Sequence, residues 1–132
     1  MPKSFDKALE NSAHLEQRFE EAGLDTETMQ TGLLIANIHK SMYDYERADA
    51  KIGELLEKAA RLGIETSRIS ADLWFIKGTI YTAYNLERDA FECYRESAKI
   101  GMALGIRDII IRAFNAAHKI NPYPAKELIT SD

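Results

Sequence analysis

The sequence predicts an all-α protein, a short α-solenoid of about six antiparallel helices. Three observations support this prediction. Apolar residues recur at the three- and four-residue spacing of amphipathic helices, a unit of about 40 residues is repeated, and no stretch alternates clearly enough to indicate a strand. Only three prolines and seven glycines occur in 132 residues, which is few for an all-β protein rich in turns.

The apolar spacing predicts six helical segments in succession. They cover residues 5–22, 29–42, 45–62, 69–84, 90–104 and about 108–120. Pro122 and Pro124 end the last segment, because proline neither continues a helix nor permits helical geometry before it. We therefore expect a helical repeat domain over residues 1–121 and a polar C-terminal tail over 122–132.

Turn and capping residues separate the segments at the expected places. Three segments are each followed by a glycine, which adopts positive φ without steric cost: Gly23, Gly63 and Gly105. Three other segments are preceded by a residue expected to cap their first backbone N–H groups: Asp25, Asp44 and Asn85.

The segments form pairs that repeat. The tripeptide at positions 62–64, Leu-Gly-Ile, recurs at positions 104–106, and Ala48 is related to Ala90 by the same offset. A slightly smaller shift matches positions 5–8 to positions 45–48. One helical pair cannot bury its apolar face alone, so stacked pairs are expected to make the core.

Composition narrows the class of function. The formal net charge is −4, and no basic cluster of the kind that binds nucleic acid or an anionic membrane occurs. One cysteine, Cys93, does not require an oxidising compartment, and no apolar run has the length of a signal core or a membrane span. We expect a cytoplasmic protein with a protein or peptide partner.

The segment 71–104 combines small and bulky residues in one pattern: Trp74, Gly78, Tyr81, Ala90, Tyr94 and Ala98. This segment resembles a tetratricopeptide repeat, a family that keeps its signature residues at or near these positions. The period of slightly over 40 positions looks like the longer-helix variant, similar to repeats of peptide-sensing bacterial regulators and eukaryotic scaffold proteins. The resemblance implies a concave groove, lined by the first helix of each pair, that holds a partner peptide.

The repeat positions predict which residues line this groove. They are Gln30, Leu33, Asn37, Lys40 and Ser41 in one repeat, with Asp72, Phe75, Thr79, Thr82 and Ala83 in the next. The mixture suits a mostly neutral peptide, with Asn37 and the threonines reading its backbone. Some family members hold a C-terminal carboxylate with basic residues, but Leu33, Phe114 and His118 replace three of them here. An ordinary solvated helix face is the alternative.

Other classes of function have less support in the sequence. Few repeats leave apolar end faces, so a homodimer is an alternative, with four candidate residues for self-association: Leu9, Ile109, Ile110 and Ile111. An enzyme is not expected, because the sequence has no glycine-rich phosphate loop and no base near Cys93. The three histidines fall on three separate predicted helices, so neither a metal nor another cofactor is expected.

Overall fold

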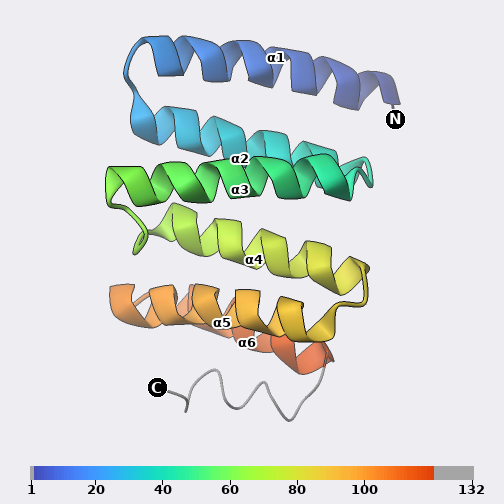
Figure 1. Cartoon of the computed structure of the whole chain (residues 1–132), viewed down its shortest axis with the longest axis vertical. Coiled ribbons are helices and arrows are strands. Elements are labelled where there is room, and N and C mark those ends of the chain that lie inside the picture. The colour runs from blue at the N-terminus through green and yellow to red at the C-terminus, as the bar shows by residue number, and fades with distance from the viewer. Residues whose placement is uncertain (1, 121–132) are drawn as a thin grey trace. The chain divides into compact units, whose positions relative to one another are not determined.

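The computed structural model describes residues 2–120, and all regular structure in this range is helical (Figure 1). Six helices follow one another: α1 (Pro2–Glu21), α2 (Asp25–Ser41), α3 (Tyr45–Leu62), α4 (Arg68–Ala83), α5 (Glu87–Leu104) and α6 (Arg107–Ile120). The predicted all-α fold of about six helices, packed as successive hairpins, is confirmed. The expected tail at 122–132 and residue 121 lie outside the described range.

The chain divides into two units, residues 1–58 and residues 59–132, and each is described by itself. The first unit contains α1, α2 and most of α3, and the second contains α4, α5 and α6.

Ion pairs join α1 to α3 in the first unit. Lys51 Nζ lies 2.7 Å from the Glu16 carboxylate, and Lys58 Nζ lies 3.6 Å from that of Glu20. Burial lowers the pKa of Lys51, but its hydrogen bonds to Glu16 and Glu54 outweigh burial and leave the pKa raised. The charged form of Lys51 is therefore the form that the folded unit stabilises.

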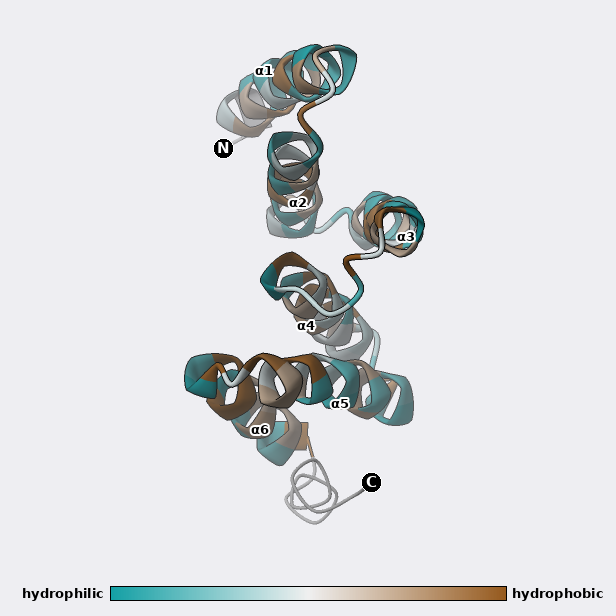
Figure 2. Cartoon of the chain, turned by 90° about the vertical axis from the view of Figure 1, so that its left-hand side faces the viewer, coloured by the Kyte–Doolittle hydropathy of each residue, from teal (hydrophilic) through white to brown (hydrophobic). Residues whose placement is uncertain are grey.

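A close helix approach organises the second unit. A Cβ atom built on Gly78 of α4 would lie 2.5 Å from Cε1 of Tyr94 on α5, so only glycine allows this ring position. Buried alanines of α5 and α6 complete the core around Tyr94: Ala90, Ala98, Ala113 and Ala117. Figure 2 shows that hydrophobic and hydrophilic residues are interspersed along α4, α5 and α6.

A buried hydrogen bond also fixes α5 against α4. The Ser97 hydroxyl donates to the carbonyl oxygen of Ala71 at 2.9 Å, and neither residue is exposed. The bond satisfies a hydroxyl that burial would otherwise penalise.

The helix ends agree with the sequence in part. Gly23, Gly63 and Gly105 have φ of 74°, 71° and 70°, as predicted for residues that end a helix. Asp44 caps α3, because its carboxylate accepts a hydrogen bond from the Arg47 amide at 3.2 Å. Ser67, which was not predicted, caps α4 by accepting from the Ser70 amide.

Two predicted caps are wrong. Leu24 precedes α2 and provides no side-chain cap. Asp25 lies in the first turn of α2, where its negative charge interacts favourably with the partial positive charge of the helix N-terminus. Asn85 has a φ of 60° and follows α4, so it supplies the left-handed turn that ends a helix. Tyr43, which has a φ of 62°, plays this role after α2.

Candidate binding pocket

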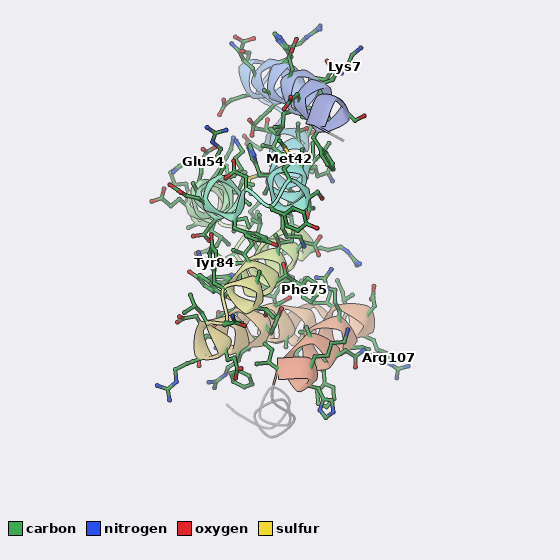
Figure 3. The ribbon with its side chains drawn as sticks, turned by 90° about the vertical axis from the view of Figure 1, so that its right-hand side faces the viewer. Lys7, Met42, Glu54, Phe75, Tyr84 and Arg107 are labelled. Carbon is green, nitrogen blue, oxygen red and sulfur yellow. The ribbon has the colours of Figure 1, made fainter. Side chains whose placement is uncertain are left out.

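An open pocket of about 440 Å³ lies in the second unit, between α4, α5 and α6. Nine residues line it: Phe75, Thr79, Thr82, Asn85, Glu87, Tyr94, Ala116, Lys119 and Ile120. Figure 3 labels Phe75 on α4, beside the ribbons of the other two helices. The volume is that of a site for a small ligand or a few side chains.

Three of the predicted groove residues meet at this pocket. Phe75, Thr79 and Thr82 stand at intervals of four and three residues on α4, so they share one face of that helix. Ala83 is exposed at the end of α4 and does not line the pocket. The α4 wall of the pocket thus consists of residues that the repeat positions predicted for the groove.

Asp72 has a different role beside the pocket. Its carboxylate accepts a hydrogen bond from Arg112 of α6 at 2.8 Å, and both side chains are partly exposed. The Arg112 guanidinium lies 4.3 Å from the centre of the Phe75 ring, within cation–π range. Asp72 therefore positions Arg112 against Phe75 and joins α4 to α6 next to the pocket.

The threonine hydroxyls in the pocket wall donate their hydrogens to backbone carbonyls of α4. Thr79 donates to the Ile76 carbonyl at 2.7 Å, and Thr82 donates to the Gly78 carbonyl at 2.9 Å. The Tyr94 hydroxyl oxygen lies 3.1 Å from Thr82 Oγ1, and burial is the main reason that the pKa of Tyr94 is raised. Tyr94 therefore remains protonated at neutral pH.

The predicted groove residues of the first unit lie together on α2. Gln30 and Ser41 are exposed, whereas Leu33, Asn37 and Lys40 are half-buried. Burial lowers the pKa of Lys40. Leu33, Asn37 and Lys40 are spaced so that they share one face of α2, and this face therefore carries both polar and apolar side chains.

The candidates for self-association divide by exposure. Ile109 is only 1% exposed and packs toward Gly101, where an added Cβ would meet Ile109 Cγ2 at 2.8 Å. Its proposed place on an association surface is therefore wrong, since it belongs to the core. Ile110 of α6 and Leu9 of α1 are half-buried, and Ile111 is 49% exposed.

The histidines and the cysteine of the described residues lie on four different helices. Within residues 2–120, no three histidine, cysteine or acidic side chains are grouped so that they would hold a metal ion. His14, His39 and His118 lie on α1, α2 and α6, and Cys93 is buried on α5. None of the helices described has the length and apolarity needed to cross a membrane.

The remaining pocket residues were not predicted from the sequence. Asn85 comes from the α4–α5 turn, Glu87 is the first residue of α5, and Ala116, Lys119 and Ile120 come from the last turns of α6. Opposite charges spaced close to the repeat offset were an available signal. Arg68 pairs with Asp108 at 3.1 Å and Asp72 pairs with Arg112, each across 40 residues, which identifies the facing positions of α4 and α6.

Comparisons with protein-family models, curated proteins and solved structures found no match for this chain. The resemblance to tetratricopeptide repeats accordingly depends on the residues of the chain itself.

Proposed function

We propose that this protein is a non-catalytic, tetratricopeptide-like module that binds a segment of a partner polypeptide in the pocket between α4, α5 and α6. The observation that carries the proposal is the composition of the pocket wall. Phe75 and Ile120 offer apolar surface, while Asn85 and Lys119 offer polar groups at positions set by two helices and a turn. Binding sites typically combine apolar walls with a few placed polar groups.

The rim of the pocket also suits a polypeptide. Asn85 lines the pocket, and its two neighbours in the chain are large apolar residues that are exposed. Tyr84 is 46% exposed and Leu86 is 43% exposed. Aromatic and apolar side chains beside a pocket provide the contacts that anchor protein interfaces.

The state of the pocket hydroxyls favours binding over catalysis. Thr79 and Thr82 donate their hydrogens to backbone carbonyls, and the pKa of Tyr94 is raised by burial. A general base needs a pKa near the working pH, and burial moves the pKa of Tyr94 further from it.

A blocking substitution tests the proposal. Peptides selected from a random library on the immobilised protein are titrated by calorimetry against wild type and Ala116→Gln, which places a longer side chain into the pocket. We expect Ala116→Gln to weaken binding at least about tenfold, since filling a pocket removes its buried contacts. Asn115→Gln, at an exposed neighbour on α6 outside the pocket, is the control and should bind as wild type.

Equal affinity of wild type and Ala116→Gln for every selected peptide would refute the pocket as the binding site. Circular dichroism of both variants checks that the helices are intact, so that a loss of binding is not a loss of fold.

A second candidate is self-association through α6. The observation that favours it is the apolar, partly uncovered pair Ile110 and Ile111, of which Ile111 is 49% exposed. Light scattering at increasing protein concentration tests this function. We expect a homodimer that Ile111→Glu returns to monomer, and a wild-type protein that remains monomeric at high concentration would exclude it.

A further inference from the structure

We infer that the pocket takes the side chain of a lysine or arginine from the bound segment. This inference rests on the proposed function and specifies the chemistry of the residue that enters. It departs from the mostly neutral peptide that the sequence suggested. Three features support it: the direction of the hydrogen bonds, the helix ends that meet at the pocket and the apolar walls.

The hydroxyl pair in the wall presents an acceptor. A threonine hydroxyl has one hydrogen, and that of Thr82 is donated to the Gly78 carbonyl at 2.9 Å. The hydrogen between Thr82 and Tyr94, whose oxygens are 3.1 Å apart, therefore comes from Tyr94. The Tyr94 oxygen is left with acceptor capacity and no hydrogen to donate, so its complement in a ligand is a hydrogen-bond donor such as an N–H group.

Helix ends add negative potential around the pocket. Thr82 lies in the last turn of α4, and Lys119 and Ile120 lie in the last turn of α6. The C-terminal end of a helix carries partial negative charge from carbonyl groups without helical partners. The N-terminal end of α5 also meets the pocket and carries partial positive charge, and its first residue, Glu87, brings a carboxylate that offsets it.

The apolar walls match the stem of a basic side chain. Phe75, Ala116 and Ile120 contribute carbon surface to the pocket, whereas the acceptors belong to Tyr94 and Glu87. Lysine and arginine carry an aliphatic stem that buries against apolar surface and a head that donates several hydrogen bonds. A partner leucine would fill the same walls and leave the acceptors without donors.

The presence of Lys119 in the pocket wall favours the opposite occupant, a carboxylate. Its ammonium lies on a long exposed side chain in the last turn of α6, where a cation is favourable in any case. The Tyr94 hydroxyl, in contrast, is buried and hydrogen-bonded to Thr82 at 3.1 Å. We therefore assign the pocket to a cation, and Lys119 competes with that cation.

Small probes of one length and different charge test the inference on the full chain. Butylammonium and butylguanidinium are titrated in parallel with butanol and pentanoate, and binding is followed by amide chemical shifts at Thr82, Asn85 and Lys119. We expect the two cations to bind saturably, and butanol and pentanoate to bind at least about tenfold more weakly, because butanol has one donor and no charge and pentanoate has no donor.

Two charge variants give opposite expectations for the two occupants. For a cation, Glu87→Gln should weaken binding about two- to fivefold and Lys119→Met should strengthen it by a similar factor, as for partly exposed charges. Asp89→Asn makes the same charge change in the first turn of α5 outside the pocket and should leave binding unchanged.

Preferential binding of pentanoate, lost in Lys119→Met, would overturn the inference, as would equal binding of all four probes. In either case the selected peptides would still bind wild type and fail to bind Ala116→Gln. The proposed function would then stand while the basic side chain would not.

Discussion

The approach of α4 to α5 at Gly78 leads to a sharp prediction about stability. In Gly78→Ala the new Cβ would lie 2.5, 2.7 and 2.9 Å from three atoms of the Tyr94 ring. A ring is rigid and Tyr94 is 2% exposed, so the helices or the ring must move. Overpacking of this kind costs about 1 to 3 kcal/mol of unfolding free energy, and it displaces the Tyr94 hydroxyl from Thr82.

A second glycine provides the matched control. Gly53 lies within α3, and a Cβ built there meets nothing within 4 Å. Glycine-to-alanine substitution in a helix gains about 1 kcal/mol, and both variants receive this gain. The difference between them therefore isolates the overlap with Tyr94.

Urea unfolding followed by far-ultraviolet circular dichroism measures both variants. We expect Gly53→Ala to be more stable than wild type by about 1 kcal/mol. Gly78→Ala should fall below Gly53→Ala by about 1 to 3 kcal/mol. Equal stabilisation of the two variants would refute the described packing of Tyr94 on Gly78.

Three further predictions follow from other contacts. Ser97→Ala should lower the unfolding free energy by about 1 kcal/mol, since the Ala71 carbonyl loses a buried donor; no change in the urea midpoint would contradict this. Tyr43→Asn should raise the melting temperature by a few degrees, because asparagine tolerates positive φ better than tyrosine; a lower temperature would mean that the exposed ring is structural. Because the pKa of Lys51 is raised, its ion pairs stabilise the fold fully below about pH 10, and this stabilisation declines as the pH rises through the pKa. In urea titrations at increasing pH, the unfolding free energy of Lys51→Met should decline less steeply, since this variant has no amine to titrate and leaves Glu16 without this partner.

Much of the fold was predictable because it depends on local spacing. The 3.6-residue period locates helices, and glycine marks places where positive φ is needed, as at Gly63 and Gly105. The repeat offset also equated Ala48 with Ala90, and both are fully buried. These features depend on residues that are close in the sequence or on a sequence pattern that the chain repeats.

The errors at helix ends have a local cause. Asparagine caps a helix N-terminus and also adopts positive φ, so the residue type of Asn85 permits both interpretations. The structure selects the second, with a φ of 60°. Applying the offset between Ala48 and Ala90 to the turns would have equated Asn85 with Tyr43 and indicated a shared backbone conformation.

The pocket was predictable only along α4. Phe75, Thr79 and Thr82 follow the spacing of one helix, whereas the opposite wall comes from α6 and depends on how two helices are brought together. The orientation of the Tyr94 hydroxyl is also a tertiary property, since it is set by Thr82 on another helix. Periodicity does not encode such contacts.

The pocket of the second unit is the place where we propose that a partner segment binds. Amide chemical-shift mapping during titration with a selected peptide measures this directly. We expect the largest shift changes at Thr79, Thr82, Asn85 and Lys119. Changes confined to α1–α3 or centred on Ile111, with these four residues unmoved, would contradict it.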